Sequence, residues 1–240
     1  MVILSRQDIE RISRRILTVY LQRQDSPLSR IDPVSFAADM YGMEFYFRKL
    51  SCDGEILGMT SMKEFAVQVE DNEGFPEWFE LDPQVALIDL SLLGDQQTGR
   101  RHFTMMHEVS HQILRMLFPT DFGLRYRICP VKYYMNRKSS DWEEWQANAL
   151  ASALLLPREL ILKHLNQAGL THIRLLNKHY APKTYMIFSM MADQLGVSKQ
   201  ALAIRMKYLG LLQADYLRNP DDLVKIYVED EEWKQLQTAI

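Results

Sequence analysis

The chain has 240 residues, of which 47% are hydrophobic and 25% charged, a composition typical of a soluble globular protein. Its formal net charge of -3 is close to neutral, so overall charge favours binding to neither nucleic acid nor membranes. The two cysteines, Cys52 and Cys129, lie far apart, which excludes a thiolate zinc site and fits a reducing compartment. The longest strongly apolar run, residues 147–157, is too short to cross a bilayer, and the N-terminus lacks a signal-peptide pattern. We therefore expect a cytoplasmic protein without a membrane association.

Two helices are predicted in the first 42 residues. Residues 6–22 carry apolar side chains at helical spacing, with arginines on the remaining surface. The segment that follows has Asp32 as a helix N-cap, Pro33 in the first turn and Gly42 as a stop signal.

The pattern then changes to short β-branched or aromatic runs separated by turn residues. We predict a small, largely antiparallel sheet from four such runs, at residues 43–50, 55–61, 65–70 and 85–91. Residues 70–95 carry eight acids and no lysine or arginine, and we expect most of this stretch to be an exposed loop.

Helical patterns return in the second half of the chain. We predict helices at about 99–117, 141–155, 158–168 and 184–208. The stretch between the first two is irregular and basic, and it is either a solvated loop or one wall of a substrate groove. Its basic residues are Arg125, Arg127, Lys132, Arg137 and Lys138.

Residues 107–111 read His-Glu-Val-Ser-His. Positions i and i+4 lie on one face of a helix, so His107 and His111 can direct imidazole nitrogens at a single ion. Glu108 stands beside the first ligand, where it can act as general base on a water molecule. This HExxH pattern arises by chance in about one such chain in a hundred. The alternative is a buried helix whose histidines bond to backbone carbonyls.

A zinc site needs a third protein ligand, and two adjacent glutamates compete for that role. Ser140 and Glu143 have the spacing of a capping box, which would give Glu143 a structural task. Glu144 is one step further around the helix, and the alanines nearby allow close approach to the HExxH helix. We favour Glu144 as the third ligand of one catalytic Zn²⁺, with the fourth position left for water. The predicted chemistry is amide hydrolysis.

The segments FTMMHEVSH and EWQANALASALLLP resemble the ImmA/IrrE family of metallo-endopeptidases. The resemblance covers about residues 30–160, and it too places a glutamate ligand at Glu144. It implies an α+β fold with a zincin-like core, a gluzincin-like ligand set and a small sheet packed on the HExxH helix. The implied domains are an N-terminal helix (1–25), the metallopeptidase (26–168) and a helical C-terminal region (169–240).

The resemblance further implies a cytoplasmic protease that cleaves a helix-turn-helix repressor of a mobile element, such as a phage, or of a stress regulon. A hydrolase of small amides fits it less well. The sequence departs from the family pattern at Met106, Ser110, Leu150 and Leu156. We expect Ser110, in place of a glycine, to affect how a neighbouring backbone packs.

A group that stabilises the oxyanion or contacts the ligands should also exist. The candidates by position are Tyr133, Tyr134, His102 and Asn148.

Residues 184–210 have the spacing of a helix-turn-helix, with Gly196 at the turn. The second helix would display Lys199, Gln200, Arg205 and Lys207 to DNA. Because positive charge is modest there, we favour a helical hairpin that packs on the rest of the chain. The competing hypothesis is a non-catalytic, metal-containing regulator that uses this hairpin to bind DNA or a partner protein.

Overall fold

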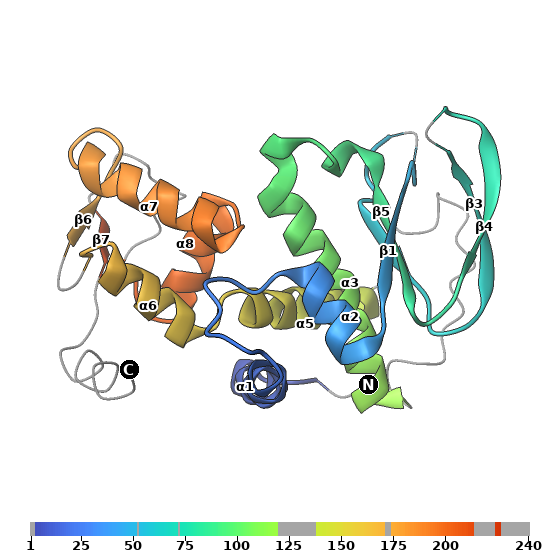
Figure 1. Cartoon of the computed structure of the whole chain (residues 1–240), viewed down its shortest axis with the longest axis horizontal. Helices are drawn as coiled ribbons and strands as arrows, with labels where there is room; N and C mark the ends of the chain where they lie inside the picture. Colours follow the sequence, from blue (N-terminus) through green and yellow to red (C-terminus); the bar gives the residue numbers. More distant parts are fainter. Residues whose placement is uncertain are drawn as a thin grey trace. The chain divides into compact units, whose positions relative to one another are not determined.

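The computed structural model describes residues 3–51, 53–71, 73–119, 138–170, 174–213 and 224–226 (Figure 1). The chain divides into two compact units, Met1–Leu155 and Leu156–Ile240. Both contain helices and short strands, so the fold is mixed α+β. None of the described helices is long and apolar enough to cross a membrane.

The first two helices form where the sequence predicts them. Helix α1 (Arg6–Gln22) begins with a capping box in which the Ser5 hydroxyl accepts from Asp8 N and the Asp8 carboxylate accepts from Ser5 N. Helix α2 (Pro33–Tyr41) has Asp32 as N-cap and ends at Gly42, whose φ of 64° is the left-handed conformation that favours glycine.

Two small sheets follow in the first unit. Strand β5 (Val85–Asp89) lies between β1 (Glu44–Arg48), which is parallel to it, and the antiparallel β2 (Gly58–Thr60). The second sheet is a hairpin of β3 (Phe65–Glu70) and β4 (Pro76–Leu81). Two of the three strand pairs described in this unit are antiparallel, as a largely antiparallel sheet predicts, but the expectation of a single sheet is wrong, and β1 and β5 pair in parallel.

The expectation of a loop over most of 70–95 is also wrong, because this stretch contains β4 and β5. Acids are compatible with strand β4 because side chains alternate across it. Phe79 and Leu81 face the core, whereas Trp78 and Glu80 point to the exposed side.

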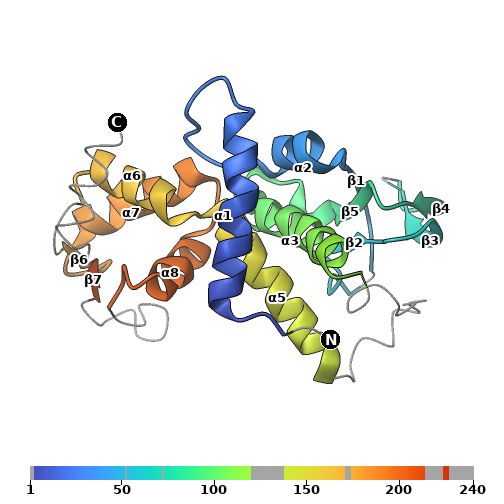
Figure 2. The ribbon, with the colours of Figure 1, turned by 90° about the horizontal axis from the view of Figure 1, so that it is seen from below.

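Two longer helices complete the first unit. Helix α3 (Thr98–Leu117) contacts β2 and β5 on one side and α5 (Lys138–Leu155) on another. Two 3₁₀ turns, η1 (Leu90–Leu92) and η2 (Asp95–Gln97), lead from β5 into α3. Ala147 and Ala151 are fully buried, which lets the α5 backbone come close to its neighbours. Helix α5 also packs on α1 (Figure 2), where Gln146 Oε1 accepts a 2.8 Å hydrogen bond from Leu4 N.

The second unit contains three described helices and one strand pair. The helices are α6 (Arg158–Gln167), α7 (Pro182–Leu195) and α8 (Lys199–Tyr208). Strands β6 (Arg174–Leu176) and β7 (Val224–Ile226) pair antiparallel and were not predicted.

Helices α7 and α8 are joined by the short turn that the sequence predicts. Gly196 ends α7 with a φ of 69°, and Ser198 caps α8 by accepting from Ala201 N. The expected display of Arg205 is wrong, because this residue is buried and its Nε donates to Leu156 O at 2.9 Å. Lys199, Gln200 and Lys207 are exposed as expected.

Candidate metal centre

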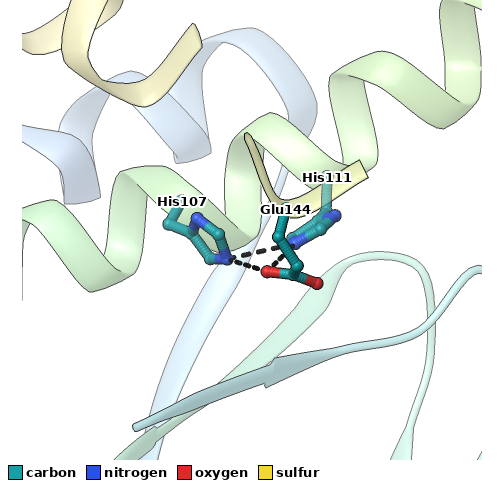
Figure 3. Close-up of side chains that lie close together, drawn as sticks. All are labelled: His107, His111 and Glu144. Carbon is teal, nitrogen blue, oxygen red and sulfur yellow. Dashed lines mark hydrogen bonds and ion pairs between the residues drawn. The ribbon is translucent and has the colours of Figure 1, made fainter. Parts of the chain in front are cut away.

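The two histidines of the HExxH segment lie one turn apart on α3, and their rings turn toward the same point (Figure 3). Their Nε2 atoms are 3.1 Å apart. Glu144, from α5, places Oε2 3.2 Å from His107 Nε2 and 3.5 Å from His111 Nε2. Among the described residues, these three form the one cluster of histidine, cysteine and acidic side chains that could hold a metal ion.

The spacing of these three atoms fits a tetrahedral metal. With zinc–ligand distances of about 2.0–2.1 Å, two ligands of a regular tetrahedron lie about 3.3–3.4 Å apart. The observed separations of 3.1, 3.2 and 3.5 Å bracket that value. Two imidazoles and one carboxylate are also a donor set that zinc accepts.

The cluster is buried on one side and open on the other. The His111 side chain is 9% exposed and that of His107 16%, whereas the Glu144 side chain is 43% exposed. Structural zinc sites are closed by four protein ligands, and catalytic sites keep a position open. Three protein ligands with one solvent-facing side match the catalytic arrangement.

Glu143 and Glu144 point to different partners. Glu143 Oε1 lies 4.0 Å from Arg115 Nε, near the end of α3. The preference for Glu144 is thus supported by geometry, but the capping-box argument for it was wrong. Helix α5 already includes Lys138, so Ser140 is not its N-cap residue. Glu143 instead lies near Arg115 in the last turn of α3, a pairing that no pattern in the sequence predicted.

Glu108 lies among the most buried polar residues of the first unit, with 6% of its surface exposed. Burial raises the pKa of its carboxyl group above the ordinary value, although the neighbouring His107 and His111 act in the opposite direction. A raised carboxyl pKa brings Glu108 closer to the range in which a side chain both accepts and returns a proton.

Within the cluster, His107 and Glu144 shift each other's pKa values. Burial lowers the pKa of His107, but the hydrogen bond to Glu144 and the charges of Glu108 and Glu144 outweigh it, so this pKa is raised. Burial raises the pKa of Glu144, yet the hydrogen bonds with both histidines prevail and hold it well below its ordinary value. The carboxylate is therefore ionised and ready to accept a cation.

Asn148 lies one turn after Glu144 and hydrogen-bonds His107, which also raises the pKa of that histidine. This supports its place beside the ligands. His102 is buried on α3. Because it precedes His107 by five residues, it lies about 140° away from His107 around the helix axis. It is not part of the cluster. Tyr133 and Tyr134 lie outside the described residues, as does most of the basic stretch.

Ser110, the unusual residue of the motif, is fully buried. Its hydroxyl donates to Met106 O at 2.7 Å, four residues earlier in the same helix. The hydroxyl is thus satisfied within α3 and needs no neighbouring backbone as acceptor.

The sequence analysis missed two residues that connect α3 to the sheet. Gln112, buried on α3, donates from Nε2 to Thr60 Oγ1 at 2.5 Å and to Ser61 O at 2.7 Å. Gly58, on β2, lies against the side chains of Thr104 and Glu108. A glycine within a strand often marks a place where another segment comes close to the strand backbone. The glycine at position 58 could therefore have predicted this contact.

The fold and the cluster together define a mixed α+β protein with three side chains between two helices that could hold a metal ion. Residues 90–207 match the model of peptidase family M78, described as the IrrE N-terminal-like domain. This match assigns residues 90–207 to the ImmA/IrrE family of metallopeptidases, as the motifs predict. No match was found among curated proteins.

Proposed function

We propose that the protein is a zinc-dependent endopeptidase that hydrolyses a peptide bond in a protein substrate. The observation that carries the proposal is the convergence of His107 Nε2, His111 Nε2 and Glu144 Oε2, with Glu108 next to His107 on the same helix. Membership of a metallopeptidase family supports it independently.

His107, His111 and Glu144 would hold the ion, which supplies a Lewis acid for the scissile carbonyl and for the attacking water. The burial of both imidazoles keeps bulk water away from one side of the site. Glu144 brings one negative charge, so the ligand set leaves a net positive centre to stabilise the oxyanion.

Glu108 is the general base and then the general acid of the proposed mechanism. Its carboxylate accepts a proton from the attacking water, and the protonated carboxyl donates that proton to the leaving nitrogen. Low solvent exposure suits this role, because burial favours the protonated form that must exist between the two steps.

We further propose that the substrate is a helix-turn-helix repressor of a mobile element or stress regulon and that cleavage takes place in the cytoplasm. This rests on the family alone. The natural candidate is a repressor encoded beside the gene for this chain.

The test incubates zinc-loaded protein with that purified repressor and identifies the products by mass spectrometry. Glu108→Gln preserves the size of the side chain and removes its basic oxygen, so it should bind zinc as the wild type does. We expect cleavage to fall about 10²–10⁴-fold, the usual contribution of a general base. Equal cleavage by wild type and Glu108→Gln would contradict the mechanism.

A second candidate function is DNA binding through α7 and α8. It is favoured by the exposed Lys199, Gln200 and Lys207 on α8 and by the charge of the surrounding sequence. Residues 156–213 contain eight basic and two acidic side chains. A helical hairpin that packs within its own unit is the simpler account.

Binding to a labelled duplex, measured at several salt concentrations, separates these two accounts. DNA binding predicts an affinity that falls steeply with salt and weakens in Lys199→Ala and Lys207→Ala. Weak binding without a salt response would rule it out.

A further inference from the structure

The edge strand β2 meets the HExxH helix at a glycine. A Cβ atom built on Gly58 would lie 2.5 Å from Glu108 Oε1 and 3.0 Å from Glu108 Cδ. It would also lie 2.9 Å from Thr104 Cγ2, one turn earlier on α3. Carbon atoms do not approach other heavy atoms this closely, so a side chain at position 58 and the present position of the Glu108 carboxylate exclude each other.

Strand β2 has little freedom to withdraw from α3. On one side its residues pair with β5, with Gly58 opposite Ile88. At its other end, Gln112 Nε2 donates to Thr60 Oγ1 and Ser61 O. The strand is therefore held by β5 along its length and by α3 at its Thr60–Ser61 end.

We propose that Gly58 is a positioning residue for the proposed peptidase reaction, and that its missing side chain leaves the space in which the Glu108 carboxylate is held. Thr104 closes the same space from the preceding turn of α3. This inference rests on the proposed role of Glu108 as general base. It assigns a task to a residue of a different element, 50 positions away in the sequence.

The contact has a direct consequence for a Gly58→Ala variant. The φ angle of Gly58 is not in the left-handed region, so alanine suits the backbone there. The easiest response to the new methyl group is rotation of the flexible Glu108 side chain, together with a small shift of Thr104 Cγ2, which would lie 2.9 Å from the new Cβ. The fold should survive while the carboxylate leaves its place.

The experiment compares zinc-loaded wild type, Gly58→Ala and Gly94→Ala in four measurements. These are bound zinc, the midpoint of thermal unfolding, kcat and KM on the best substrate of a quenched-fluorescent peptide library, and a crystal structure. Gly94 is the matched control, because a Cβ built there meets nothing within 4 Å and its φ is -62°.

For Gly58→Ala we expect an unchanged zinc content and an unfolding midpoint within about 3 °C of wild type. We expect kcat to fall about 10²-fold with little change in KM, as follows when a catalytic group is misplaced by about 1 Å. The crystal structure should show the Glu108 carboxylate displaced with all three metal ligands in place. Gly94→Ala should match wild type throughout.

A double-mutant cycle separates positioning from a merely structural effect. In a Glu108→Gln background there is no base left to misplace, so the losses from the two substitutions should not multiply. Multiplying losses, or a Gly58→Ala variant with wild-type kcat and an unmoved carboxylate, would overturn the inference. If the wild type cleaves no peptide and no repressor, the proposed function fails instead, and the crystal structure alone decides whether Gly58 sets the position of Glu108.

Discussion

Arg115 Nε lies 4.0 Å from Glu143 Oε1, which joins the last turn of α3 to α5 beside the candidate metal centre. Both side chains are only about one-fifth exposed. The next residue, Glu144, faces the two histidines one to two turns earlier on α3. The two adjacent glutamates of α5 therefore both contact α3. Glu143 lies near the Arg115 side chain, and Glu144 lies beside the two histidines of the candidate metal centre.

Substitution of these two glutamates should have separable effects. Glu144→Ala removes a metal ligand, so we expect zinc affinity to fall more than about 100-fold, beyond the loss seen for residues that only support a ligand. Glu143→Ala should leave zinc content unchanged and lower the free energy of unfolding by about 1 kcal/mol. Metal analysis after dialysis and urea denaturation measure the two effects. Loss of zinc from Glu143→Ala would show that the ligand assignment is wrong.

Zinc should stabilise the first unit against heat. The ion binds the folded arrangement of α3 and α5, so free zinc at 100 times its dissociation constant adds about 2.7 kcal/mol. This corresponds to a rise of roughly 5–10 °C in the unfolding midpoint. Calorimetry with and without a chelator measures the shift. His111→Ala serves as control, and a shift of equal size in that variant would place the zinc elsewhere.

Stability should fall at alkaline pH because of Tyr41. Burial raises the pKa of this tyrosine from 10.0 to about 12. Its neutral form is thus favoured in the folded state, and the stabilisation is complete below pH 10 and is lost as the pH rises from 10 to 12. Because Tyr41 is partly exposed, we expect a loss of at most about 2 kcal/mol. Urea unfolding of wild type and Tyr41→Phe at pH 9 and 11.5 isolates this contribution, since the phenylalanine variant lacks it. Parallel losses in both proteins would contradict it.

Arg205 should matter for the stability of the second unit. Arg205→Ala leaves the Leu156 carbonyl without this donor, and we expect a loss of about 1–3 kcal/mol in the free energy of unfolding. Lys207→Ala, on the exposed side of the same helix, should change stability by less than about 0.5 kcal/mol. Similar losses in both variants would show that the buried Arg205 contributes no more to the stability of the fold than the exposed Lys207. Because Arg205 is buried, a loss of DNA binding in Arg205→Ala can be attributed to a DNA contact only if the stability of the variant is measured as well.

Local signals predicted much of this fold. Caps and stop residues such as Asp32 and Gly42 act within one helical turn, and both formed as expected. The closeness of His107 and His111 was predictable for the same reason, because i and i+4 spacing on a helix fixes their relative position. Glu144 lies beside both histidines, as its predicted role as a ligand requires, but the capping box used to choose it is absent from the helix.

Contacts between distant segments were beyond such reasoning. The parallel pairing of β1 with β5 depends on how 36 intervening residues between Arg48 and Val85 are arranged, and no local pattern reports it. Strand β4 was not predicted because its acidic residues suggested a loop. Whether a strand can pack on a core depends only on the side chains that face the core. Gln112 and Gly58 acquire their meaning only once β2 lies against α3.

The hydrogen bond from Leu4 N to Gln146 Oε1 joins residues 142 positions apart. Its acceptor lies two residues after Glu144, on the helix that also supplies the third proposed metal ligand. During synthesis, the ribosome releases α1 long before it makes this partner. The anchoring of the first segment and the completion of the candidate metal centre therefore both require α5, and a nascent chain that stops before α5 can form neither.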